Sequence, residues 1–207
     1  MARSSLAIDP GTGMKIATFN VNGVNGRLPR LLEWLEESAP DVACLQEIKT
    51  GDATFPAKAI EVAGYGSIWH GQPKHHGVAI LARGELPREL RRGLPGDDAD
   101  LQARYLEAEV RGITIASVYL PNGNPQPGPK FDYKLAWFER LTQHAHTLIE
   151  SGRDVVLAGD FNVVPTDADI YNAWLWQLGR RAATRNARSV SAVAGARLVG
   201  RDSASAP

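Results

Sequence analysis

The chain has 207 residues, of which 43% are hydrophobic and 22% charged, a globular composition that excludes general disorder. Its 23 basic and 23 acidic residues cancel, which excludes attachment to nucleic acid or membrane by bulk charge but permits a local basic groove. The single cysteine, Cys44, excludes a disulfide framework or a cysteine-based zinc site within one chain, and it fits a reducing, cytoplasmic compartment.

The N-terminal segment, residues 1–13, lacks the apolar centre of a secretion signal. We expect it to be a disordered extension, with the folded part beginning at Met14. No apolar run in the chain approaches the roughly 18 residues that a membrane span needs, so we expect no membrane partner.

Short strands and amphipathic helices then alternate. Apolar runs rich in β-branched residues predict strands at 15–21, 41–46, 67–70, 78–82, 105–110, 113–120 and 154–158. Apolar residues at three- and four-residue steps predict helices from Leu28 onward, at 54–63 and at 131–150. Arg111-Gly112 between two strands predicts a hairpin. This order favours α/β layers with a mixed sheet.

The composition changes near Asn172. Residues 173–207 contain six arginines and one acidic residue, so this tail carries a net charge of +5 and the rest of the chain −5. The tail is rich in Ala, Arg and Ser and has no clear strand period. It is either a flexible basic tail or a segment that replaced something else. We therefore expect one domain at 14–172, followed by a divergent basic tail at 173–207.

Polar residues stand where four predicted strands end. They are Asn20 and Asn22, Glu47, Tyr119 with Asn122, and Asp160 with Asn162. Functional sites of α/β sheets assemble at strand ends, and a buried carboxylate needs a partner or a cation. Hard oxygen donors suit Mg²⁺ or Mn²⁺, which act at phosphate esters. The residues support metal-assisted phosphodiester or phosphomonoester hydrolysis; the alternative is that these Asp and Asn residues only form turns.

Six segments, in this order, resemble exonuclease III, the bacterial apurinic/apyrimidinic (AP) endonuclease family of the endonuclease/exonuclease/phosphatase superfamily. They are KIATFNVNGVNGR, DVACLQEIKT, WHGQPKHHGVAIL, ITIASVYLPNG, KFDYKLAWFERL and VVLAGDFNVVPTDADIYN. The resemblance covers 14–172 and implies a four-layered α/β sandwich with two packed mixed β-sheets. It also implies an Mg²⁺-dependent DNA repair nuclease that acts, as a monomer, on double-stranded DNA at abasic sites and 3′ ends.

The resemblance assigns a role to each matching residue. Asn20 matches an active-site asparagine, Glu47 the metal-binding glutamate and Tyr119 the catalytic tyrosine. Asp160 matches the catalytic aspartate that handles the proton of the nucleophile or leaving group, and Asn162 the asparagine that stabilises the transition state. We expect the metal at Glu47, Asp160, Asn162 and Asn20.

Other polar residues have alternative roles. Asn122 stands where the family often places a DNA-contacting amide. Lys130 and Lys134 either face the DNA backbone or are ordinary cations at the start of a helix. His144 and His146 are two positions apart on a predicted helix and do not share a face, so we expect both at the surface.

The chain departs from the family after residue 172. Family members continue with further strands, a later aspartate and a terminal Ser-Asp-His motif, whereas here all five histidines precede the break and Asp202 is the one late acid. We expect an incomplete second sheet and an activity impaired by loss of these residues. Two alternatives stay open: a non-catalytic DNA-binding or defective fragment, and a phosphatase of the same superfamily acting on lipid or nucleotide phosphates.

Overall fold

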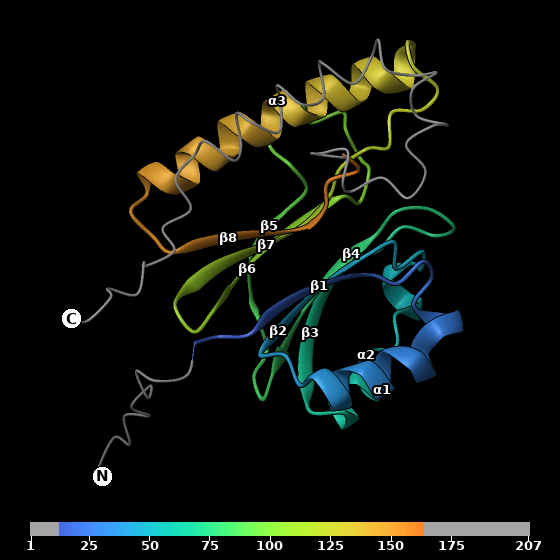
Figure 1. The fold of residues 1–207 in the computed structure, drawn as a ribbon, viewed down its shortest axis with the longest axis vertical. Coiled ribbons are helices and arrows are strands. Elements are labelled where there is room, and N and C mark those ends of the chain that lie inside the picture. Colours follow the sequence, from blue (N-terminus) through green and yellow to red (C-terminus); the bar gives the residue numbers. More distant parts are fainter. Residues whose placement is uncertain (1–12, 164–207) are drawn as a thin grey trace, which may run out of the picture.

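The computed structural model describes residues 13–163, which contain three helices and two sheets. The helices are α1 (Leu28–Ser38), α2 (Ala57–Val62) and α3 (Pro129–Glu150), and 3-10 turns lie at Asn25–Arg27 and Asp52–Thr54. Helices α1 and α2 cover the first sheet, the second sheet packs on its other face, and α3 covers the second sheet (Figure 1). The four-layered α/β sandwich expected from the sequence is confirmed.

Both sheets have four strands and are mixed. The first runs in the order β1 (Ile16–Asn20), β2 (Val42–Gln46), β4 (Val78–Arg83) and β3 (Tyr65–His70). The second runs in the order β5 (Arg88–Arg92), β6 (Tyr105–Val110), β7 (Ile113–Tyr119) and β8 (Val155–Asp160). In each sheet one edge pair is parallel, β1 with β2 and β7 with β8, and the other pairs are antiparallel.

Three apolar layers hold these elements together. The layer under α1 and α2 includes Leu31, Leu35, Leu45, Ile60 and Leu81. The layer between the sheets includes Cys44, Ile80, Leu106, Val110 and Ile115. The layer under α3 includes Tyr105, Val118, Trp137, Phe138 and Leu141. Burial of this apolar surface is the main stabilising contribution to the fold.

Local sequence explains most of the element boundaries. In α1 the buried Leu31 and Leu35 lie one turn apart, and the helix ends where Ala39 adopts a left-handed conformation before Pro40. The predicted hairpin at Arg111-Gly112 is confirmed: both residues have positive φ (49° and 79°), as a two-residue type I′ turn requires.

The sequence patterns missed or misplaced some features. Strand β5 (RELRR) went unpredicted because four of its five residues are charged, which suits its place at a sheet edge. Helix α2 starts only at Ala57, three residues later than expected, because a 3-10 turn and Pro56 precede it. His144, expected at the surface, has a side chain only 10% exposed and contacts Glu107 of β6.

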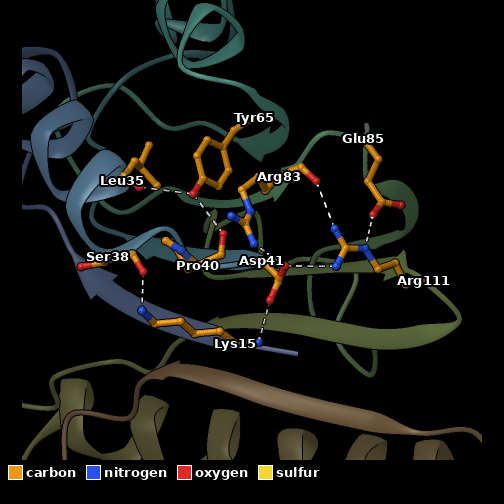
Figure 2. A network of polar contacts seen from close by, with 9 residues as sticks. All are labelled: Lys15, Leu35, Ser38, Pro40, Asp41, Tyr65, Arg83, Glu85 and Arg111. Carbon is orange, nitrogen blue, oxygen red and sulfur yellow. Dashed lines mark hydrogen bonds and ion pairs between the residues drawn. The ribbon is translucent and has the colours of Figure 1, made fainter. Parts of the chain in front are cut away.

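A polar network joins the two sheets (Figure 2). Its members lie before β2 and in the β6–β7 turn, at the end of these strands opposite to the predicted site. The Asp41 carboxylate accepts hydrogen bonds from Arg83 Nη2 (2.8 Å), Arg111 Nη1 (3.1 Å) and the backbone N–H of Lys15 (2.9 Å). Arg111, in the β6–β7 turn of the second sheet, also donates from Nε to Glu85 Oε1 (2.8 Å). The Arg83 hydrogen bond, followed by that of Lys15, lowers the pKa of Asp41 from 3.8 to about 2.

Some expectations fall on other parts of the chain. The N-terminal extension up to residue 12, residues 164–172 of the expected domain and the basic tail at 173–207 lie outside the described residues, as does the expected incompleteness of the second sheet. Between residues 13 and 163, no helix has both the length and the apolar character needed to cross a bilayer.

Candidate active site

The predicted strand ends meet at one end of the sandwich. Asn20 ends β1 in the first sheet, and Asp160 ends β8 in the second, 140 residues later. The Asn20 amide donates from Nδ2 to Glu47 Oε1 and to Asp160 Oδ2, both at 2.9 Å. One carboxamide therefore holds the two predicted metal-binding carboxylates together across the interface between the sheets.

Glu47 directly follows β2 and has a left-handed backbone, with φ of 53°. A non-glycine residue in this region is uncommon, and such residues occur at active sites as well as in turns. Its other carboxylate oxygen, Oε2, forms an ion pair with Lys49 Nζ at 2.7 Å. Burial acts to raise the pKa of Glu47, but hydrogen bonds from Asn20, Lys49 and Tyr119 outweigh it and lower that pKa below 4.5. Glu47 is therefore a carboxylate at neutral pH.

Tyr119 ends β7 and lies beside Glu47. The Arg104 guanidinium lies over the Tyr119 ring, with its Cζ 4.8 Å from the ring centre. The centres of the His76 and Tyr119 rings are 6.1 Å apart. Arg104 also donates from Nη1 to the Tyr119 carbonyl at 3.3 Å. Burial, and then the hydrogen bond with Glu47, raises the pKa of Tyr119 to about 12, so the phenol stays protonated and can donate to a ligand.

His76 is uncharged at this site. Burial, and then the nearby Arg104, lowers the pKa of its imidazole from 6.5 to about 4. Its neighbour His75 is exposed. The positive charge beside Tyr119 therefore comes from Arg104.

Asn162 closes the site after β8. Its backbone N–H donates to Asp160 Oδ1 at 2.9 Å, and its side-chain Nδ2 donates to the Leu120 carbonyl at 2.8 Å. Asn122, in the loop after β7, donates from Nδ2 to Asn162 Oδ1 at 3.4 Å and is otherwise exposed. The structure thus brings Asn122 to the rim of the cluster formed by Asn20, Glu47, Asp160 and Asn162.

The two lysines of α3 lie in different environments. Lys130 is exposed in the first turn. Lys134 is buried within residues 13–163, with 2% of its surface exposed, so its ammonium does not face DNA. Burial lowers the pKa of Lys134 to about 8, although Asp160 acts in the opposite direction. The signal for burial was present in the sequence, because Lys134 lies three residues after Phe131 and four before Phe138, on one helix face.

Two other contributors were missed by sequence reasoning. Lys49 forms the ion pair with Glu47, and Arg104 stacks on Tyr119. Neither Lys49 nor Arg104 belongs to a sequence motif that would indicate the side chain it contacts. Arg104 comes to Tyr119 only through the antiparallel pairing of β6 with β7, in which the Tyr119 N–H donates to the Arg104 carbonyl at 2.8 Å.

The donor set fits a hard divalent cation. Glu47 and Asp160 supply carboxylate oxygens. Asn20 and Asn162 each carry an amide oxygen, which in this structure accepts from the Asn22 backbone N–H at 3.2 Å and from Asn122 Nδ2 at 3.4 Å, respectively. Over residues 13–163 no group of three or more His, Cys, Asp or Glu side chains is placed to hold a metal ion. Ions such as Mg²⁺ and Mn²⁺ retain several waters and require only one or two carboxylates, so this set suffices for them.

Comparison with known proteins identifies relatives of both sequence and fold. Residues 17–191 match the endonuclease/exonuclease/phosphatase family. The chain is 37% identical over 162 residues to exodeoxyribonuclease III of Haemophilus influenzae, covering 76% of this chain and 60% of that protein. It is 28% identical to an exodeoxyribonuclease of Bacillus subtilis, covering 77% and 62%. The chain thus spans about three fifths of the length of these two relatives.

Solved structures share the fold. An AP endonuclease from Archaeoglobus fulgidus is 31% identical with a TM-score of 0.80, over 88% of this chain and 70% of that one. A 3′ phosphatase from Neisseria, solved with a product DNA hairpin, is 36% identical with a TM-score of 0.75, over 86% and 71%.

Proposed function

Because the chain belongs to the endonuclease/exonuclease/phosphatase family, we propose that it is a metal-dependent DNA repair nuclease of the exonuclease III type. The proposed substrate is double-stranded DNA with abasic sites or 3′ ends. The observation that carries the proposal is the Asn20 amide, which holds Glu47 and Asp160 at 2.9 Å each across the two sheets. The names of the relatives, an exodeoxyribonuclease III, an AP endonuclease and a 3′ phosphatase, agree with it.

The proposed metal is Mg²⁺, with Mn²⁺ as a substitute. Glu47, Asp160, Asn20 and Asn162 would hold it. When bound, the ion neutralises the negative charge that builds on the phosphoryl oxygens. We propose that Asp160 accepts the proton of the attacking water or supplies one to the leaving oxygen.

Neutral donors complete the proposed site. The Tyr119 phenol, whose pKa of about 12 keeps it protonated, hydrogen-bonds to Glu47 in this structure and would redirect its one O–H to a non-bridging phosphate oxygen when DNA binds. The Asn162 amide uses one N–H on the Leu120 carbonyl and keeps the other for the phosphate. Asn122, at the rim, and Lys130, exposed on α3, contact the DNA backbone and position it without reading its sequence.

We further propose that this chain acts as a monomer in a reducing cytoplasm and that its nuclease activity is impaired. Residues 147–207 contain no histidine and therefore no Ser-Asp-His motif. Removing one member of a group of residues that acts as a unit abolishes most of the rate. This observation also favours a second candidate function: binding of DNA without cleavage.

Metal binding provides the direct test. Titration of the purified chain with Mn²⁺, followed by calorimetry, should show one site, and Glu47→Gln and Asp160→Asn should each weaken it by roughly tenfold or more. The exposed Glu36→Gln serves as the matched control and should bind like the wild type. Equal Mn²⁺ affinity in all four proteins would refute the proposed site.

Cleavage separates the two functions. With Mg²⁺ and a duplex containing one abasic site, we expect slow cleavage that Asp160→Asn removes. Salt-dependent binding of the duplex without any product would favour the non-catalytic function.

A further inference from the structure

Helix α3 carries a buried lysine that reaches both loops of the proposed site. The ammonium of Lys134 donates from Nζ to the carbonyl of Asn162 at 2.7 Å and to the carbonyl of Asn122 at 3.2 Å. Asn162 follows β8 and Asn122 follows β7. We propose that Lys134 is a positioning residue, which fixes the backbone of these two loops so that the metal- and phosphate-binding side chains are held in place. The proposal rests on the proposed function.

The burial of Lys134 makes these contacts specific. In the described part of the chain Lys134 forms no ion pair with a carboxylate, and its hydrogen bonds go to the two loop carbonyls. A buried ammonium is costly unless its N–H groups are satisfied. Any displacement of either carbonyl therefore removes a charge-assisted bond, which favours the one arrangement of both loops that satisfies the lysine.

The loop after β7 is shaped around the lysine stem. Gly123 has φ of 79°, and a Cβ at this position would lie 2.6 Å from Lys134 Cδ. Only glycine avoids both the left-handed strain and this overlap. The loop backbone therefore lies directly on the aliphatic part of Lys134.

The carbonyl that Lys134 holds belongs to the residue that completes the site. With its carbonyl fixed, Asn162 keeps its backbone N–H on Asp160 Oδ1 and its amide on the Leu120 carbonyl. Asn162 has φ of 48°, which asparagine adopts more readily than other non-glycine residues. Lys134 holds its carbonyl from outside the site and hydrogen-bonds to neither the Glu47 nor the Asp160 carboxylate.

The test compares Lys134→Met, which keeps an apolar stem without the ammonium, with Lys58→Met, which removes an exposed lysine of α2. In the metal-free proteins, amide hydrogen exchange at Asn162, whose N–H donates to Asp160 Oδ1, and at Asn124, whose N–H donates to Asn122 Oδ1, should accelerate at least tenfold in Lys134→Met and stay unchanged in Lys58→Met. Mn²⁺ affinity, measured where thermal unfolding shows both variants folded, should fall roughly tenfold only in Lys134→Met. A purely structural role would lower the melting temperature without changing the affinity of the folded protein.

These measurements distinguish failure of the positioning role of Lys134 from failure of the proposed function. If the wild type binds no Mn²⁺, the proposed function fails, and the exchange rates still decide the role of Lys134. If Lys134→Met binds Mn²⁺ like the wild type, with unchanged exchange, the inference is overturned and the function stands.

A measurement on the wild type covers the case in which the variant does not fold. Scalar couplings across hydrogen bonds should connect Lys134 Nζ with the carbonyl carbons of Asn122 and Asn162, and their absence would overturn the inference.

Discussion

Replacing Asp41 by asparagine should weaken the fold in a pH-dependent way. The charge of Asp41 is shared by Arg83 and Arg111, and the pKa of its carboxyl falls from 3.8 to about 2. A shift of this size corresponds to about 2 kcal/mol of stability. Because Arg83 and Arg111 are 47% and 37% exposed, solvent screening reduces the expected loss in Asp41→Asn at pH 7 to about 1 to 2 kcal/mol.

The direction of the pH dependence follows from the lowered pKa. The contribution of Asp41 is complete above pH 3.8, where the unfolded carboxyl is ionised, and disappears as the pH falls through about 2. Urea unfolding at several pH values measures it. The wild type should lose its advantage over Asp41→Asn between these values. Asp98→Asn, at an exposed site, is the control. A constant difference at every pH, or none between Asp41→Asn and Asp98→Asn, would refute the electrostatic account of this network.

Three further substitutions, each measured by urea unfolding, test two packing contacts and one buried carboxylate. Gly159→Ala places a Cβ 1.9 Å from the Val118 carbonyl in the parallel β7–β8 pair, so we expect a loss of about 3 kcal/mol or failure to fold, whereas Gly152→Ala, with open space around it, should lose less. Trp137→Ala should cost about 3 to 5 kcal/mol, because this side chain is buried under α3. Burial acts to raise the pKa of Glu107, but hydrogen bonds with His144 and Tyr105 outweigh it and lower that pKa. The wild type should therefore lose more stability than Glu107→Gln as the pH falls below 4.5. Equal losses in the two proteins would contradict this account.

Local sequence determined the elements because their signals lie within a few residues. The leucines of α1, the β-branched runs and the Arg111-Gly112 turn each fix a local backbone choice, and the structure shows them where they were expected. Strand β5 was the exception, since its charged residues carry no apolar period and its place comes from pairing with β6. A strand at an edge takes its conformation from its neighbour more than from its own sequence.

The candidate residues were identified by type and by their position at strand ends, but their mutual geometry was not contained in the sequence. Asn20 and Asp160 are 140 residues apart, and their contact depends on two sheets packing so that β1 lies against β8. Arg104 and Lys134 show the same limit: one reaches Tyr119 through strand pairing and the other reaches Asn162 through helix packing. The sequence alone thus determined that hydrophobic strands end in oxygen-bearing side chains, because strand formation and strand ends depend on neighbouring residues. Only the tertiary structure decided which of those side chains share a site and which cations hold them, because such distances arise from the packing of the whole domain.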